Sequence, residues 1–240
     1  MRDEGSDLDA SKVTDNDLAS EADDAQGEGL AHGSADAQLD PHVDPLVIRL
    51  EDELRLRAEG MAGKDLGSFV SSELLEVHRA LRSVLDQDLH RGTLFCEWGS
   101  GFGAICALAA SLGLEAHGIE IQGELVVAAE ELMQELDLEA SFVQGTFLLP
   151  GVEDLAATCK HTEGEASDQA YRELGLPLSA FDIVFAYPWP QEEMLHEELF
   201  LLHGSAGALL LTYAEFAGVL VQRHTGDRKE IQTLGWMGRA

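Results

Sequence analysis

Apolar strand-like runs alternate with helical segments along residues 45–240, and this alternation constrains the fold more than any other feature. The expected strands are rich in β-forming residues and lie at 93–98, 116–121, 141–147, 181–187 and 207–213. Continuous apolar runs separated by helices are typical of a parallel sheet that is covered on both faces. The sequence therefore predicts a doubly wound α/β fold.

Helical patterns separate these strands. We expect long helices at 46–60, 71–89, 104–112, 123–136 and 191–204, and one or two short helices within 153–174. Ser71 or Ser72 is a candidate N-cap for the second helix. The last stretch, 218–236, is expected to form two strands around the turn "TGDR", which makes an antiparallel hairpin at the sheet edge. The prediction is a mostly parallel, seven-stranded, Rossmann-like sheet with helices on both faces.

The chain divides into two parts by composition. Residues 1–44 carry thirteen Asp or Glu against Arg2 and Lys12, without a periodic apolar pattern. Such a segment buries too little apolar surface to fold, so we expect a disordered acidic tail. Residues 45–240 are expected to form the folded domain.

The acidity of the chain bears on its partners. The formal net charge is −30, whereas a nucleic-acid footprint is basic, so DNA and RNA are disfavoured as partners. We expect no signal peptide, no membrane span and a cytoplasmic location. The three cysteines are consistent with reduced thiols. The sequence does not indicate an oligomeric state.

A glycine-rich turn, "CEWGSGFG" at 96–103, follows the first predicted strand. In an open parallel sheet a ligand binds at the carboxyl ends of the strands, and glycines in this turn allow close approach of the backbone. Gly99, Gly101 and Gly103 fall in that turn. Glu120 closes the second strand, where its oxygens could accept hydrogen bonds from a ribose diol.

Two ligands fit this pattern. The spacing of Gly99, Gly101 and Ala104 also satisfies the dinucleotide fingerprint, so an NAD-dependent oxidoreductase stays open as an alternative. Glu97 favours the other ligand, because a carboxylate would repel a pyrophosphate but attract the sulfonium and ammonium groups of S-adenosylmethionine.

The segment "EWGSGFG" resembles the E/D-x-G-x-G-x-G signature of class I, seven-strand S-adenosylmethionine-dependent methyltransferases, and the resemblance covers roughly residues 65–240. It implies that this chain is a methyltransferase. Glu97 and the turn from Gly99 through Ser100 and Gly101 to Gly103 would hold the methionine part of the cofactor. Glu120 would hold the ribose hydroxyls, and Thr146 stands where the family often contacts the adenine.

The fourth strand ends in "AYPWP", where family members that act on amino groups often carry an Asn or Asp, two prolines and an aromatic residue. This chain has the prolines and aromatic residues but lacks the acid or amide. Tyr187 and Trp189 are the candidate catalytic residues, because aromatic walls could align a cationic amine. The acceptor is an unidentified protein or small molecule, and a non-catalytic binding module is a further alternative.

A metal site is not expected. His196 and His203 are seven residues apart on one predicted helix and could share a face. Neither a cysteine nor an acidic residue completes a zinc geometry with them.

Overall fold

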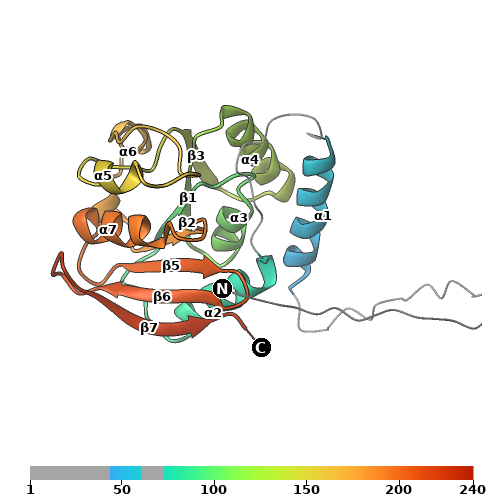
Figure 1. Ribbon diagram of the computed structural model, residues 1–240. Coiled ribbons are helices and arrows are strands. Elements are labelled where there is room, and N and C mark those ends of the chain that lie inside the picture. The colour runs from blue at the N-terminus through green and yellow to red at the C-terminus, as the bar shows by residue number, and fades with distance from the viewer. Residues whose placement is uncertain (1–43, 61–72, 240) are drawn as a thin grey trace, which may run out of the picture. The chain divides into compact units, whose positions relative to one another are not determined.

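The computed structural model describes residues 44–60 and 73–239. They contain a seven-stranded sheet with the order β3-β2-β1-β4-β5-β6-β7 (Figure 1). Strands β1 to β5 are parallel, and the chain crosses from β3 back past β1 to form β4. This confirms the doubly wound, mostly parallel fold. The strands are β1 (Leu94–Trp98), β2 (Glu115–Glu120), β3 (Ala140–Gln144), β4 (Ile183–Ala186), β5 (Leu209–Ala214), β6 (Gly218–His224) and β7 (Ile231–Met237).

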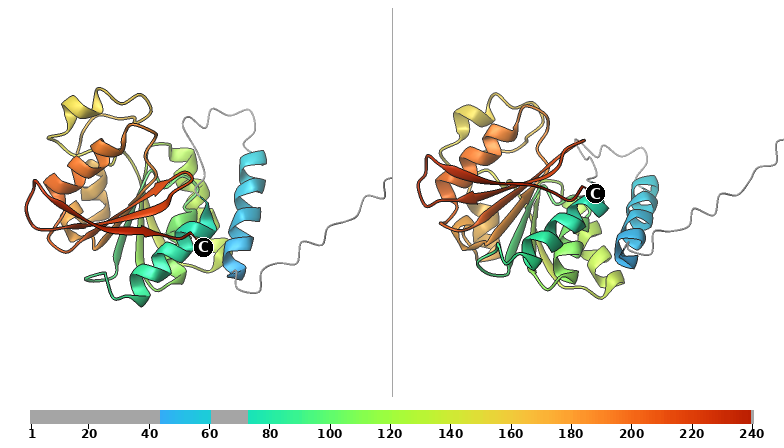
Figure 2. Two further views of the ribbon diagram at one scale, coloured as in Figure 1. Left: turned by 60° about the horizontal axis from the view of Figure 1, so that its bottom comes forward. Right: turned by 90° about the horizontal axis from the view of Figure 1, so that it is seen from below.

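Both faces of the sheet are covered by helices, as the view along the sheet in Figure 2 shows. Successive side chains of a strand point to opposite faces, so Phe95 packs in one hydrophobic core and Cys96 in the other. Helices α1 (Pro45–Gly60), α2 (Leu74–Asp86), α3 (Ala104–Ser111) and α4 (Gly123–Leu136) contribute to the first core. Helices α6 (Gln169–Leu174) and α7 (Glu193–His203) contribute to the second.

The long helices lie where their apolar periodicity predicts them. Helix α1 ends at Gly60 and α4 matches its predicted range, while α2 begins at Leu74 with Glu73 as its N-cap. The predicted caps Ser71 and Ser72 lie outside the described residues. Two short helices, α5 (Glu153–Ala156) and α6, lie within the irregular segment as expected. Among residues 44–60 and 73–239, no helix is long and apolar enough to cross a bilayer.

The C-terminal strands form the expected edge hairpin, β6 and β7, which pair antiparallel. Strand β6 also pairs antiparallel with β5, from Leu209 opposite Arg223 to Ala214 opposite Gly218. The last three strands are thus a meander, in which the turn between β5 and β6 brings residues 215–217 to the carboxyl edge of the parallel strands. The sequence pattern predicted only the second of these two hairpins.

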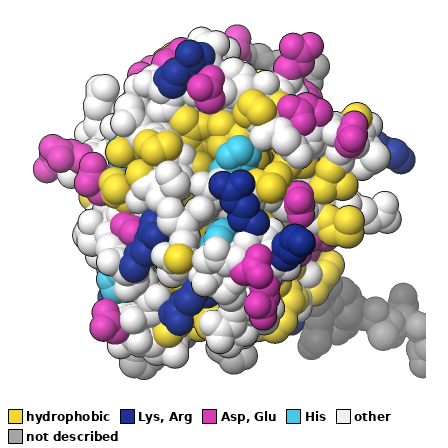
Figure 3. Space-filling model, turned by 90° about the vertical axis from the view of Figure 1, so that its left-hand side faces the viewer, with side chains coloured by type: hydrophobic (Ala, Val, Ile, Leu, Met, Phe, Trp, Pro, Cys, Tyr) yellow, Lys and Arg dark blue, Asp and Glu magenta, His cyan; other side chains and the backbone are white. Residues whose placement is uncertain are grey.

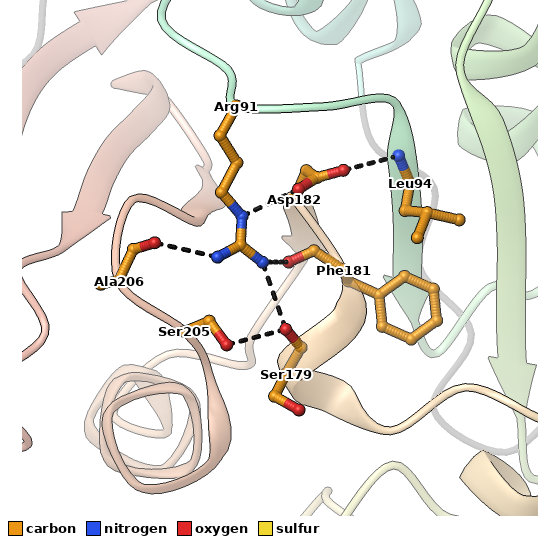
Figure 4. A network of polar contacts seen from close by, with 7 residues as sticks. All are labelled: Arg91, Leu94, Ser179, Phe181, Asp182, Ser205 and Ala206. Carbon is orange, nitrogen blue, oxygen red and sulfur yellow. Dashed lines mark hydrogen bonds and ion pairs between the residues drawn. The ribbon is translucent and has the colours of Figure 1, made fainter.

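A polar network holds the amino ends of the central strands together (Figure 4). The guanidinium of Arg91 donates to Asp182, at 2.8 Å, and to three main-chain oxygens, those of Ser179, Phe181 and Ala206. The second carboxylate oxygen of Asp182 accepts a hydrogen bond from the amide of Leu94, at 3.0 Å. The network therefore connects β1, β4 and the approach to β5.

The surface around this end of the sheet has mixed charge. On the face where β5 begins, Lys and Arg side chains are interspersed with Asp and Glu side chains (Figure 3). The surface at the amino edge is therefore not uniformly basic.

Candidate functional site

The glycine turn joins β1 to α3 at the carboxyl edge of the sheet. Its three glycines have positive φ angles of 71°, 52° and 76° at Gly99, Gly101 and Gly103. A Cβ on Gly103 would also lie 2.7 Å from Phe142, so this position requires glycine for space as well as for conformation. The amides of Gly99 and Ser100 donate to the carbonyl of Ile119, at 2.9 and 3.1 Å, which fixes the turn against β2.

Glu120 ends β2 directly beside this turn. One carboxylate oxygen accepts from the amide of Gly101 and the other from the amide of Gln122, both at 2.9 Å. The residue is only 6% exposed, yet it lines a cavity. A carboxylate oxygen can accept more than one hydrogen bond, so each oxygen retains capacity for a ligand hydroxyl.

Glu97 belongs to β1 and does not line that cavity. Its carboxylate accepts a hydrogen bond from the amide of Cys106, the third residue of α3, at 3.1 Å. Burial raises the pKa of Glu97 to about 8, against the lowering effect of its hydrogen bonds to Cys106. The raised pKa favours the protonated form of Glu97, which weakens the attraction of its charge for a sulfonium. Its predicted contact with the methionine part of a cofactor stays a prediction.

A cavity of about 580 Å³ opens at the carboxyl ends of the parallel strands. This volume lies within the range of about 300–1,000 Å³ that is usual for small-molecule sites. The cavity lies where the strand order reverses between β1 and β4, the position at which open α/β sheets bind ligands. Its lining includes Trp98, Gly99, Glu120, Ile121, Gln122, Leu125, Thr146, Phe147, Tyr187, Trp189, His196, Tyr213 and Phe216.

The charges of the cavity are of one sign. Four carboxylates line it, those of Glu120, Glu163, Glu193 and Glu215. No Lys or Arg is found among the described residues of the lining. Glu120 is buried, whereas Glu163, Glu193 and Glu215 are exposed and more strongly screened by solvent. A ligand that carries positive charge is therefore favoured over a polyanion, most strongly beside Glu120.

Aromatic rings form one wall. Tyr187 packs edge-on against Tyr213, with ring centroids 4.9 Å apart. Trp189 stacks on His161, with centroids 4.3 Å apart and an interplanar angle of 26°. Both residues predicted at the exit of β4 thus line the cavity, and each has an aromatic partner that limits its rotation.

The loop that carries His161 is held by one buried carboxylate. Glu192, 4% exposed, accepts hydrogen bonds from the amides of Lys160 and His161 and from the hydroxyl of Thr162, at 2.7–3.0 Å. Burial raises the pKa of Glu192, but hydrogen bonds from Thr162, His161 and Lys160 outweigh this effect and the net pKa is lowered. The ionised carboxylate therefore fixes one wall of the cavity.

The remaining predicted residues differ in their access to the cavity. Gly99 and Thr146 line it, and the Thr146 hydroxyl also accepts from the amide of Leu148 at 3.1 Å. Ser100, Gly101 and Gly103 belong to the turn but do not line the cavity. The Ser100 hydroxyl is buried next to Gly118, so this side chain points into the protein. The cofactor contacts predicted for these residues stay predictions.

Several lining residues were missed by the sequence analysis. His196 was considered only as a metal ligand, although it lies in the first turn of α7 and lines the cavity. Phe216 lies at the cavity with 76% exposure and a φ of 69°, an unusual conformation for a phenylalanine. The loop residues 161–163 gave no sequence signal, since a contact some 30 residues away positions them.

In the described part of the chain, no group of three or more His, Cys, Asp or Glu side chains could hold a metal ion. The two histidines of α7 diverge, since His203 Nε2 hydrogen-bonds the carbonyl of Pro150 at 2.8 Å while His196 faces the cavity.

Comparison with known proteins gives structural similarities only. No protein-family model matches the chain, and no curated protein matches it. An RNA methyltransferase from Salinibacter ruber in complex with S-adenosyl-L-homocysteine is 21% identical, with a TM-score of 0.38 over 55% of this chain and 72% of that chain. An S-adenosylhomocysteine-bound methyltransferase of Podospora anserina is 17% identical, with a TM-score of 0.43 over 71% and 62%. A methyltransferase from Geobacter sulfurreducens is 16% identical, with a TM-score of 0.42 over 72% and 75%.

Proposed function

We propose that this chain binds S-adenosylmethionine in the cavity at the carboxyl edge of the sheet and directs its methyl group to an amine of a protein or small molecule. The observation that carries the proposal is the charge of the site. A ligand cavity at the strand-order reversal is lined by four carboxylates and, among the described residues, by no basic side chain. S-adenosylmethionine carries a sulfonium and an ammonium, so its charge matches these walls.

NAD is a poorer match for two reasons. In dinucleotide-binding folds the pyrophosphate lies at the amino end of the helix after the glycine turn, where free amides point at it. Here the side chain of Glu97 already accepts from one of those amides, that of Cys106. The carboxylates of the cavity would also repel two phosphates. These features favour the sulfonium ligand over an NAD-dependent oxidoreductase.

Glu120, Gly99 and Thr146 are the residues that would hold the cofactor. Glu120 is fixed by two backbone amides, so its free lone pairs are directed before a ribose diol arrives. Gly99 offers close approach of the backbone, and Thr146 offers a hydroxyl near the end of β3. When bound, S-adenosylmethionine supplies a methyl group that its positive sulfur already activates for transfer.

Tyr187 and Trp189 would form the acceptor wall. Aromatic faces attract a cationic amine, and nearby carboxylates add to this attraction. An amine must lose one proton before its nitrogen can attack, and alignment of that nitrogen with the methyl carbon is the main task of the walls. This combination favours an amine over a phosphate-bearing or carboxylate-bearing acceptor.

The experiment is a transfer assay with methyl-tritiated S-adenosylmethionine. The purified protein is incubated with labelled cofactor and cell lysate, and label is followed into the protein and small-molecule fractions. Label that depends on the wild-type protein and is lost with Glu120→Ala supports the proposal. Cofactor binding without any transfer would instead favour a non-catalytic binding module.

A further inference from the structure

His196 lies in the first turn of α7 and lines the cavity while being only 4% exposed. Its ring lies against two aromatic neighbours, Phe147 at 5.3 Å and Trp98 at 5.9 Å between centroids. These contacts hold the imidazole in the same cavity that Tyr187 and Trp189 line. A titratable group is thus fixed at the cavity by ring contacts.

The hydrogen bond at one ring nitrogen determines the chemistry of the other. His196 Nδ1 lies 3.0 Å from the carbonyl oxygen of Glu192. A carbonyl only accepts hydrogen bonds, so Nδ1 must carry the proton. In a neutral imidazole Nε2 then bears a lone pair, and it has no hydrogen-bond partner among residues 44–60 and 73–239. The ring therefore presents a proton acceptor at the cavity.

The surroundings keep the ring neutral. Burial lowers the pKa of His196. The carbonyl and carboxylate of Glu192, the N-cap of α7, and the carboxylate of Glu193 in its first turn only partly oppose this effect. The neighbours from β1 and from the segment after β3, Trp98 and Phe147, are uncharged rings. At neutral pH Nε2 is available as a base.

We propose that His196 is the general base of methyl transfer, an inference that rests on the proposed function. The acceptor amine first loses its ammonium proton to water. The neutral nitrogen then donates an N–H to Nε2, and this hydrogen bond directs the lone pair of the attacking nitrogen toward the methyl carbon. That lone pair forms the new nitrogen–carbon bond, and the carbon–sulfur bond breaks with its electron pair left on sulfur. The N–H proton passes to Nε2, and the imidazolium then returns it to solvent.

The first test uses ¹⁵N-detected imidazole spectra of the whole protein, with His196 assigned by its absence in His196→Asn. We expect Nε2 to be unprotonated at pH 7. Its signal should differ between the S-adenosylmethionine and S-adenosylhomocysteine complexes, because only the former places a positive sulfur near the ring. The Nε2 atom of His203 hydrogen-bonds the carbonyl of Pro150. The His203 signal should therefore be the same in the two complexes.

A proton on Nε2, or identical His196 signals in the two complexes, would overturn the assignment. Failure of the proposed function looks different, because then neither ligand would bind and no histidine signal would move. The two failures are therefore distinguishable without any acceptor.

The second test measures transfer of tritium from methyl-labelled cofactor to poly-L-lysine and to propylamine. Asn can still donate to the Glu192 carbonyl but lacks a group at the Nε2 position. His196→Asn should lower kcat by about 100-fold or more and leave the KM for the cofactor unchanged. The pH–rate profile should lose the limb that is due to the imidazole and keep the limb that is due to deprotonation of the acceptor amine. A wild-type kcat in this variant would assign His196 to packing alone.

Discussion

The carboxylate of Glu120 accepts a hydrogen bond from the amide of Gly101 at 2.9 Å, so the acid that ends β2 is fastened to the glycine turn after β1. We expect Glu120→Ala to weaken S-adenosylmethionine binding by about 2–4 kcal/mol, because hydrogen bonds to a charged group are lost. The melting temperature should also fall, since the amides of Gly101 and Gln122 lose their acceptor inside the protein. Calorimetry and thermal unfolding measure the two effects.

Glu130→Gln is the matched control, since Glu130 is exposed on α4 and does not line the cavity. It changes the net charge of the protein by the same amount and should leave cofactor affinity unchanged. An unaltered affinity in Glu120→Ala would remove Glu120 from the site.

The aromatic exit of β4 gives a prediction about catalysis. Tyr187→Ala or Trp189→Ala should lower the rate of methyl transfer by about tenfold or more while cofactor affinity stays within about twofold, because the acceptor loses its alignment but the glycine turn is untouched. Trp236→Ala is the control, since Trp236 is 54% exposed on β7 and does not line the cavity. Full transfer activity in both variants would limit "YPWP" to a structural role.

The sequence predicted the architecture well where a local pattern determines it. Helix α4 keeps its apolar face over its whole length, and the polar turn "TGDR" lies between β6 and β7, so both were predictable. The hairpin of β5 and β6 was missed, because nothing in the apolar pattern of β6 distinguishes parallel from antiparallel pairing with β5.

The site was less predictable because its contacts are distant in the chain. The glycine motif identified Glu97 as a candidate site residue. Its hydrogen bond with Cys106 and its raised pKa could not be predicted, because they depend on burial between β1 and α3. The wall at His161 depends on Glu192, some 30 residues away. Side-chain hydrogen bonds of this kind leave no periodic trace in a sequence.

Glu192 yields a prediction about the loop. Glu192→Gln should increase cleavage by trypsin after Lys160 by about tenfold, since a neutral amide holds the three loop donors less strongly. Mass spectrometry of the fragments measures the rate, and Glu198→Gln, an exposed change within α7, is the control. Equal cleavage of the two variants would show that Glu192 does not hold the loop.

The stabilisation of the loop by Glu192 should depend on pH with a definite sign. The pKa of Glu192 in the folded protein is lower than its usual value of 4.5. The stabilisation is therefore present above about pH 4.5 and is lost as the pH falls through the folded pKa. Wild-type cleavage by an acid-active protease should rise in this range, whereas that of Glu192→Gln should not.

Arg91 yields a prediction about stability. Arg91→Ala should lower the free energy of unfolding by about 2–4 kcal/mol, because Asp182 and three main-chain oxygens lose a charged donor. Arg172→Ala is the control and should cost less than about 1 kcal/mol, since its pair with Asp168 is 70% and 60% exposed. Urea unfolding measures both, and equal losses would contradict a special role for the Arg91 network.

Titration calorimetry of the wild-type protein with S-adenosylmethionine, S-adenosylhomocysteine and NAD tests the central claim most directly. The acidic cavity predicts one-to-one binding of the first two ligands, with dissociation constants in roughly the micromolar range, and no measurable binding of NAD. Binding of NAD in preference to the sulfonium ligand, or no heat with any of the three from folded protein, would contradict the account.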